Sequence, residues 1–383
     1  MQRRAFLVES GRGVAAWSIL ALVGCGRRGP VPATDERWKP LVAELDALIP
    51  GWMAETVVPG VSIAVVQNAQ LVWRKGFGVR DASTKAPVDD ATVFEAQSMS
   101  KPVFAYLVMQ LRGKGVLDLD TPLSTYTAPP VELKGDPRAK LITARRVLSH
   151  TTGLPNWRSK EEPFLLSFTP GDKYRYSGEG YSYLQSVVTH LTGRVDTGDC
   201  GSFEMGVKVC ATDIDAYMKA NVLSPLGMAS SGYLRDEVLE PHLARRHDAS
   251  GQPMDMFRPT RPAVARYASA GGLLTTAADY AKFVSAVLEP RDGDPFRLSR
   301  AAITEMLTPQ VKVDPTVSWA LGWAVAHPPG GDVIFHAGGI TGAHCLAMAS
   351  VPRKSGIVVM TNGQNGYRLI EKVKTSGAAG KLL

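Results

Sequence analysis

A serine and a lysine are separated by two residues in the segment Ser98-Met99-Ser100-Lys101. On a helical turn this spacing places both side chains on one face. If desolvation lowers the pKa of the lysine from its usual value of about 10.4, the amine can accept the hydroxyl proton, and the serine can attack an acyl carbonyl. The alternative is a serine at a helix start beside a solvated lysine, because about one such match arises by chance in a chain of this size.

The residues around this pair favour the reactive interpretation. The segment Glu95–Lys101 precedes an apolar run, so Ser98 is expected near the start of a helix, where backbone N–H groups have no intrahelical acceptor. Pro102 is compatible with the first turn of a helix and not with its interior. Such free N–H groups are the donors that stabilise the oxyanion of an acyl transfer.

Strands are predicted at the two ends of the chain. The runs Val61–Gln67 and Leu71–Phe77, separated by Asn68–Gln70, predict a hairpin. Their partners are expected in three further runs near the C-terminus: Trp319–Ala326, Val333–His336, and Cys345–Val351 followed by Ile357–Met360. The fold class is therefore α/β (α+β), with an antiparallel five-stranded sheet built from both chain ends and flanked by helices.

The middle of the chain is mostly helical by pattern, for example at Val103–Met109 and Asp213–Leu223. We therefore expect a sheet domain made of residues 39–100 and 290–383, and a mostly helical inserted domain of residues 101–289. A ligand cleft is expected between them, because ligand sites form preferentially where two parts of a chain meet.

The first residues resemble an export signal. Arg3-Arg4 precedes the uncharged stretch Gly13–Gly24, which is shorter than the roughly 18 apolar residues of a spanning helix. Residues 1–24 are thus expected to be a signal peptide of the lipoprotein type, with a possible twin-arginine signal, and residues 25–38 a linker. Cys25 follows small aliphatic residues, as in a bacterial lipobox, and is expected to carry lipid; an ordinary buried cysteine is the alternative. The predicted location is the periplasm, as a membrane-anchored lipoprotein.

The other cysteines and the charge restrict the classes of partner. In an oxidising compartment Cys200 and Cys210 either form a local disulfide or stay free, and Cys345 lies in an apolar run typical of an inert buried thiol. The net charge of +7, from 43 Lys and Arg against 36 Asp and Glu, is not concentrated in a basic run, which argues against nucleic-acid binding.

No metal site is expected. His242, His247 and Asp248 have neither the spacing of one helical face nor a further cluster of ligands, so they are interpreted as surface residues.

Eight segments between Pro59 and Gly366 together resemble the serine β-lactamase and penicillin-binding-protein family. The resemblance is to the class C-like branch, which also holds family VIII esterases, D-Ala-D-Ala carboxypeptidases and D-aminopeptidases. The segments are Pro59–Ser62, Gly76–Gly78, Ser98–Lys101, Leu148–Pro155, Tyr174–Gly178, Pro225–Met228, Ala270–Leu273 and His336–Gly339.

The resemblance implies a role for each residue that matches a family motif. Ser98 would be the acylated nucleophile and Lys101 its proton acceptor, and Tyr176 would be the phenol or phenolate that relays the proton to the leaving group. On its own sequence context, Tyr176 could equally be a core aromatic residue. The resemblance also implies a β-lactamase/transpeptidase-like fold, and no metal or organic cofactor is expected.

Two positions depart from the family pattern in the substrate-binding and oxyanion set. That set comprises His336 and Gly338 on a strand beside the cleft, Gly339, whose N–H would join that of Ser98, and Gly178. His336 stands where efficient β-lactam hydrolases carry lysine, and an ordinary histidine is mostly neutral at pH 7. Gly178 stands where the Tyr-x-Asn motif has asparagine, and Glu179 would replace that amide only if the loop turned it inward.

The sequence therefore predicts a serine hydrolase that forms an acyl-enzyme on Ser98 and acts on esters or D-amino-acid peptides. A weak class C-like β-lactamase is an alternative, and a non-catalytic protein that binds cell-wall peptide is an alternative of another class. The expected partners are a small ester, D-peptide or β-lactam substrate and a membrane, through Cys25.

Overall fold

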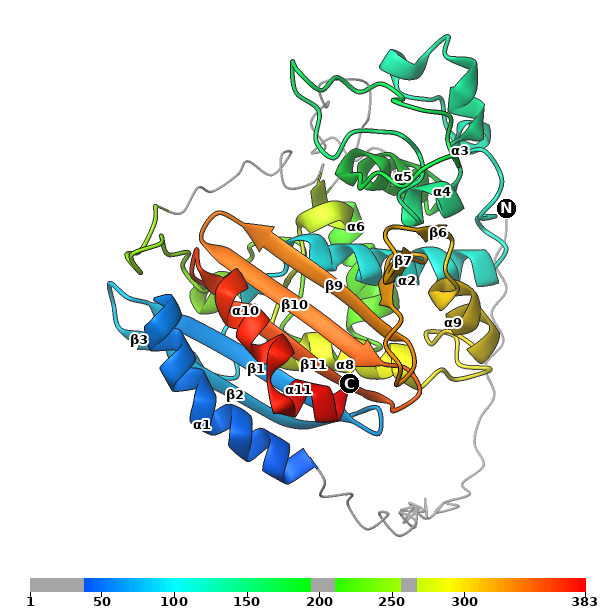
Figure 1. Cartoon of the computed structure of the whole chain (residues 1–383). Helices are drawn as coiled ribbons and strands as arrows, with labels where there is room; N and C mark the ends of the chain where they lie inside the picture. Colours follow the sequence, from blue (N-terminus) through cyan, green and yellow to red (C-terminus); the bar gives the residue numbers. More distant parts are fainter. Residues whose placement is uncertain (1–37, 194–210, 256–266) are drawn as a thin grey trace, which may run out of the picture. The chain divides into compact units, whose positions relative to one another are not determined.

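A nine-stranded antiparallel sheet brings the two ends of the described chain together, in the order β3-β2-β1-β11-β10-β9-β8-β7-β6 (Figure 1). The computed structural model describes residues 38–193, 211–255 and 267–383, which lie within one compact unit. The five longest strands are β1 (Gly60–Gln67), β2 (Gln70–Asp81), β9 (Val333–Ile340), β10 (Ala343–Ser350) and β11 (Ser355–Thr361). Short strands extend the predicted five-stranded sheet at both edges: β3 (Ala86–Pro87), β6 (Val311–Lys312), β7 (Val317–Trp319) and β8 (Ala324–Ala326).

The predicted first hairpin is present, and its turn has two residues. Gln67 pairs with Gln70, and the intervening Asn68 and Ala69 have φ angles of 52° and 55°. Two consecutive positive φ angles are typical of the type I′ turn, whose twist matches that of the flanking strands.

The run Trp319–Ala326 does not form one strand, which corrects the sequence-based expectation. It is split between β7 and β8 by a tight turn in which the N–H of Ala320 donates to the carbonyl oxygen of Trp323 at 2.8 Å. Gly322 within this turn has a φ of 87°, a backbone conformation that interrupts an extended run.

Both faces of the central strand β1 are covered by helices, so its side chains alternate between two cores. Ile63 and Val65 belong to the core under α1 (Trp38–Thr56), α10 (Gly366–Thr375) and α11 (Gly377–Leu382). Ala64 and Val66 belong to the core on the other face, which includes α8 (Ala277–Leu288) and α2 (Ser100–Gly113) (Figure 1). The C-terminal segment thus breaks into two helices near Gly377, and α11 buries Ala378, Ala379 and Leu382.

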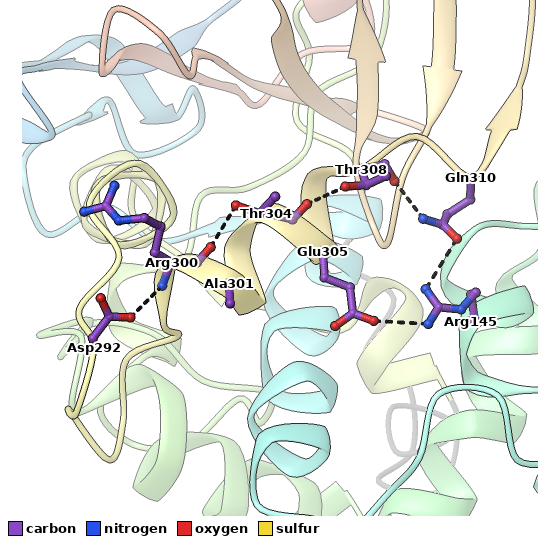
Figure 2. A pocket seen from close by; sticks show the side chains of 8 residues that line it. All are labelled: Arg145, Asp292, Arg300, Ala301, Thr304, Glu305, Thr308 and Gln310. Carbon is purple, nitrogen blue, oxygen red and sulfur yellow. Dashed lines mark hydrogen bonds and ion pairs between the residues drawn. The ribbon is translucent and has the colours of Figure 1, made fainter.

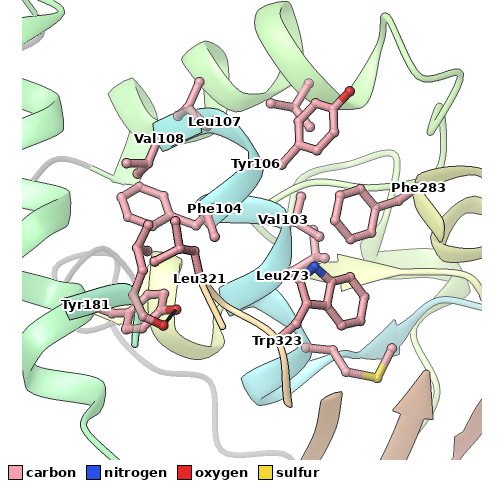
Figure 3. Packing of buried hydrophobic residues seen from close by; sticks show 14 of the residues in the cluster. Val103, Phe104, Tyr106, Leu107, Val108, Tyr181, Leu273, Phe283, Leu321 and Trp323 are labelled. Atoms are coloured by element: carbon pink, nitrogen blue, oxygen red, sulfur yellow. Dashed lines mark hydrogen bonds between the residues drawn. The ribbon is translucent and has the colours of Figure 1, made fainter. Parts of the chain in front are cut away.

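Helix α2 carries the lysine of the predicted pair and is buried on every side from Ser100 to Leu111. Figure 3 shows it crossing the larger core between Tyr181 on α5 and Phe283 on α8. The rings of Phe104 and Tyr181 are 6.2 Å apart. The start of α2 is therefore fixed by packing from several elements.

The remaining described elements are short and connect the sheet to the helical part. They are β4 (Phe94–Glu95), η1 (Gln97–Met99), α3 (Leu123–Tyr126), η2 (Val131–Leu133), η3 (Pro137–Leu141), α4 (Ala144–Leu148), α5 (Gly178–Leu191), α6 (Ala211–Met218), η4 (Lys219–Leu223), η5 (Glu240–His242), β5 (Leu274–Thr275) and α9 (Arg300–Leu307). The predicted helices at Val103–Met109 and Asp213–Leu223 are confirmed, the second ending in the π-helical turn η4.

Several predictions concern residues outside the described ranges: the signal peptide of residues 1–24, lipidation of Cys25, most of the linker, and the pairing of Cys200 with Cys210. Within the described ranges, no helix has the length and apolar character needed to cross a bilayer.

Of the two histidines interpreted as surface residues, His242 is exposed as expected, whereas His247 is not. Its side chain is fully buried, and its Nε2 accepts a hydrogen bond from the N–H of Ala82 at 3.1 Å. Its Nδ1 lies 2.9 Å from the carbonyl oxygen of Asn362. His247 therefore links its own segment to those of Ala82 and Asn362, which the local sequence does not indicate.

Candidate active site

Ser98 lies in a strained turn that leads directly into α2. Gln97, just before it, has a φ of 48°, which is unfavourable for a residue with a Cβ. The hydroxyl of Ser100 holds this turn, because it donates to the carbonyl oxygen of Gln97 at 2.6 Å and accepts from the N–H of Leu273 at 2.9 Å. Ser98 is thus presented, half-buried, at the start of a buried helix.

The amine of Lys101 lies 3.2 Å from the hydroxyl oxygen of Ser98. The lysine side chain is fully buried, and its Nζ donates to the carbonyl oxygen of Ala270 at 2.7 Å. Desolvation lowers its pKa to about 7, with no carboxylate contributing to the shift. A large fraction of Lys101 is therefore neutral near pH 7 and can accept the proton of Ser98, as its spacing predicted.

Tyr176 completes the cluster from a distant loop. Its ring centroid is 4.7 Å from the amine of Lys101. The nearby Ser98 hydroxyl lowers the pKa of Tyr176. Among the described residues, the phenol oxygen has no hydrogen-bond partner of standard geometry. Burial dominates and raises the pKa of Tyr176 well above its ordinary value. The structure therefore favours a protonated phenol over the phenolate that the sequence left open.

His150 positions Tyr176 through the two residues on either side of it. The carbonyl oxygen of His150 accepts from the N–H of Arg175 at 2.7 Å, and its Nδ1 accepts from the N–H of Ser177 at 3.0 Å. Its ring lies over that of Tyr176, with centroids 4.1 Å apart. Burial, with smaller contributions from Lys101 and His336, lowers the pKa of His150 well below its ordinary value, so it acts as a neutral acceptor.

Strand β9 lies beside the turn that carries Ser98. A Cβ on Gly338 would lie 2.2 Å from the carbonyl oxygen of Ala96, so this close approach requires glycine. Behind it, the thiol of Cys345 donates to the same carbonyl oxygen at 3.1 Å. Cys345 is a buried free thiol whose pKa is raised to about 12 by burial, which confirms the expected inert cysteine. Gly339 follows on the same strand and is exposed.

His336 is a neutral group in this site. Its Nδ1 lies 2.8 Å from the carbonyl oxygen of Ala337, to which the N–H of the neutral ring can donate. Burial, aided by the charge of Lys101, lowers the pKa of His336 to about 3. It therefore offers no cation to a substrate carboxylate, and its Nε2 is left buried without a hydrogen-bond partner.

Gly178 is the first residue of α5, and its N–H bonds within the protein, to the backbone and side-chain oxygens of Asn156. Glu179 does not replace the missing asparagine. Its carboxylate is fully buried and pairs with Arg158 at 2.7 Å. The position next to Gly178 is filled instead by the indole of Trp157, whose ring atoms would lie 2.5 to 2.8 Å from a Cβ at residue 178.

A separate pocket of about 760 Å³ lies against α9 (Figure 2). Its lining includes Arg145, which is paired with Glu305 at 3.1 Å and with Asp120 at 2.7 Å. Its lining residues include none of the Ser98 cluster, and the guanidinium of Arg145 is already paired with two carboxylates. This pocket is therefore separate from the cluster around Ser98.

The structure brings Ser98, Lys101 and Tyr176 together and places β9 beside them, as predicted. The sequence reasoning gave no role to His150 or Trp157. His150 lies within a segment already noted for its resemblance, and its positive φ of 56° is a property that sequence does not reveal. Trp157 lies just beyond that segment. The glycine at residue 178, where the family motif has asparagine, was the one signal that another side chain fills the space of the asparagine.

Sequence comparison places the chain among known proteins. A family model described as "Beta-lactamase" matches residues 45–375. "Protein flp" of Staphylococcus aureus is 20% identical over 354 residues, covering 87% of this chain and 66% of its own. "Esterase EstB" of Burkholderia gladioli is 25% identical over 246 residues, covering 56% of this chain and 57% of its own. The chain thus spans less than two thirds of the length of each of these relatives.

Structural comparison gives the same fold. The solved D-alanine carboxypeptidase AmpC of Burkholderia cenocepacia is similar to this chain with a TM-score of 0.71 and 19% identity, covering 90% of this chain and 99% of that one. At this identity the likeness concerns the fold alone.

Proposed function

This chain belongs to the β-lactamase family, and from that membership we propose that it is a serine hydrolase forming an acyl-enzyme on Ser98. Esters or D-amino-acid peptides are its substrates, with esters preferred. The observation that carries the proposal is the buried amine of Lys101, 3.2 Å from the Ser98 hydroxyl and with a pKa of about 7.

The chemistry would proceed by general base and nucleophilic catalysis. Neutral Lys101 takes the hydroxyl proton while the Ser98 oxygen bonds to the acyl carbon, and the carbonyl oxygen becomes an oxyanion near the N–H groups of Ser98 and Gly339. When the bond to the leaving group breaks, the phenol of Tyr176 gives it a proton and regains one from the Lys101 ammonium. Water then releases the acyl group by the same steps in reverse.

The preference for esters is supported by two binding groups that this site lacks, a cation and a side-chain amide. His336 gives no positive charge for a substrate carboxylate, and Gly178 has no side-chain amide to hold a peptide or β-lactam amide. An ester needs neither contact, and its leaving group departs more easily than an amine. A weak β-lactamase activity is the second candidate, since the acylation machinery would be the same.

The test compares purified protein with the Ser98→Ala variant on a chromogenic short-chain ester, a chromogenic cephalosporin and a D-Ala-D-Ala peptide. We expect ester hydrolysis to be fastest and the variant to lose about 10³-fold or more in kcat. Intact mass measurement after treatment with a fluorophosphonate should show one adduct on the parent protein and none on Ser98→Ala. Equal rates for both proteins on all three substrates, with no adduct, would leave only a binding role.

A further inference from the structure

The indole of Trp157 occupies the space that a side chain at residue 178 would need. A Cβ built on Gly178 would lie 2.5 Å from Cη2, 2.6 Å from Cζ3 and 2.8 Å from Cζ2 of that ring. Real Cβ atoms essentially never approach so closely, so Gly178 and Trp157 form a matched pair. The absence of a side chain at residue 178 is therefore what lets an aromatic ring lie there.

The backbone on both sides of Trp157 is clamped to the start of α5. The carbonyl oxygen of Asn156 accepts from the N–H groups of Gly178 and Glu179 at 3.1 and 3.0 Å. On the other side, the N–H of Arg158 donates to the Glu179 carboxylate at 3.1 Å, and its guanidinium pairs with the same carboxylate at 2.7 Å. This carboxylate is fully buried, so the clamp is strong and specific.

The ring itself borders the reacting groups and stays accessible. Its centroid is 5.9 Å from the amine of Lys101, and the ring of Tyr267 meets it edge-on, with centroids 4.8 Å apart. Trp157 nevertheless remains 39% exposed. A rigid aromatic ring that is held on one side and open on another, next to a nucleophile, is a surface for an apolar group of the substrate.

We propose that Trp157 determines substrate specificity at this site, by contacting the acyl group and favouring a flat, aromatic acyl group over acetyl. This inference rests on the proposed acyl-enzyme chemistry. The acyl group stays attached to Ser98 in the intermediate, among the rings around Lys101, whereas the leaving group departs to solvent. The six-membered part of the indole carries no hydrogen-bonding group, so contact with it favours an arene over an amide.

The experiment measures the rate at which Ser98 is labelled by two phosphonate esters with the same leaving group, one carrying phenyl and the other methyl on phosphorus. Intact mass identifies the adduct. In the parent protein we expect faster labelling by the phenyl reagent. Trp157→Ala should lower the phenyl-to-methyl rate ratio about tenfold, the discrimination typical of a hydrophobic pocket, and Trp157→Phe should restore most of it.

Two further variants make the result specific. Gly178→Ala keeps the tryptophan but displaces its ring, and should lower the same ratio. Trp73→Ala removes a partly buried tryptophan from β2, next to the other core, and should leave the ratio unchanged. Hydrolysis of 4-nitrophenyl benzoate against 4-nitrophenyl acetate should follow the same order.

The outcomes separate the two proposals. Labelling of Ser98 with an unchanged ratio in Trp157→Ala overturns the role of Trp157 and leaves the proposed function intact. A change that appears only when the alcohol part of the ester is varied overturns the assignment to the acyl side. Absence of labelling by both reagents in the parent protein overturns the proposed function and this inference together.

Discussion

The reactivity that we propose for this site depends on an amine that burial, and not a counter-charge, makes neutral. Lys101 is fully enclosed, its hydrogen bond to the carbonyl oxygen of Ala270 leaves the lone pair for Ser98, and desolvation is the cause of its low pKa. The neighbouring His150 and His336 are also kept neutral by burial. Protonation of Lys101 would remove the lone pair that accepts the Ser98 proton, and the site would then have no base.

The pKa of Lys101 predicts how activity depends on pH. Because the neutral amine is the active form, kcat/KM for an ester should be low below pH 6, rise about tenfold per pH unit and level off above about pH 7 to 8. Lys101→Met should lose about 10²- to 10⁴-fold in kcat. A pH–rate profile of the parent enzyme tests this expectation, and a flat or falling profile would contradict it.

The same shift affects stability, with a definite sign. The folded pKa of about 7 lies below the ordinary value of 10.5, so between these values the unfolded chain binds the proton and the folded chain does not. The free energy of unfolding of the parent, relative to Lys101→Met, should therefore decrease by about 1.4 kcal/mol per unit as pH falls through this window. Urea unfolding of both proteins at pH 7.5 and 9 measures the difference.

At this scale the sequence predicted the residues whose relation is local. Ser98 and Lys101 are three residues apart, so helical geometry alone brings them together. Tyr176 could be assigned only through family resemblance, since a loop carries it to the site. Trp157 was not predicted because its role depends on a tertiary contact with Gly178. His150 was not predicted because its role depends on a positive φ. Neither feature leaves a periodic signal in the sequence.

At the scale of elements, the start of α2 is held from several directions. The turn between β7 and β8 packs against it through Gly322, whose N–H also donates to the carbonyl oxygen of Leu148, the last residue of α4, at 3.0 Å. A Cβ on Gly322 would lie 2.6 Å from that of Ala105 and 3.6 Å from the carbonyl oxygen of Lys101. The turn that splits the predicted long strand is thus a support for the nucleophile helix.

Gly322→Ala should therefore destabilise the protein and reduce its activity. The positive φ of 87° and the clash with α2 should together cost about 2–4 kcal/mol in the free energy of unfolding. Gly293→Ala is the matched control, because Gly293 has a φ of 78° but nothing within 4 Å of its Cβ position. Chemical unfolding of both variants should show the larger loss for Gly322→Ala, and similar losses would contradict the packing argument.

The elements that the sequence predicted well are those with strong local signals. Alternation and β-rich composition located the long strands, and Asn68 marked the first turn. The short strands β6, β7 and β8 were missed or merged because two or three residues give no period, and their pairing comes from the neighbouring strand.

At the scale of the whole molecule, the location of the protein remains our proposal. Cys25 follows an uncharged stretch in the sequence, and we expect its thiol to carry lipid. Cys25→Ala should move the protein from the membrane fraction to the soluble fraction of a bacterial host. Cys345→Ala is the control, because that thiol is buried and should not affect the distribution. An unchanged distribution in Cys25→Ala would contradict anchoring at this residue.

The pairing of β1 with β11 has a consequence for the order in which the protein matures. Val61 pairs with Thr361, and the nucleophile turn rests on β9 and β10 through Gly338 and Cys345. A ribosome must therefore have released the chain through β11 before the turn that carries Ser98 gains its support from the sheet. We therefore expect a nascent chain that ends before β11 to be unreactive toward the fluorophosphonate.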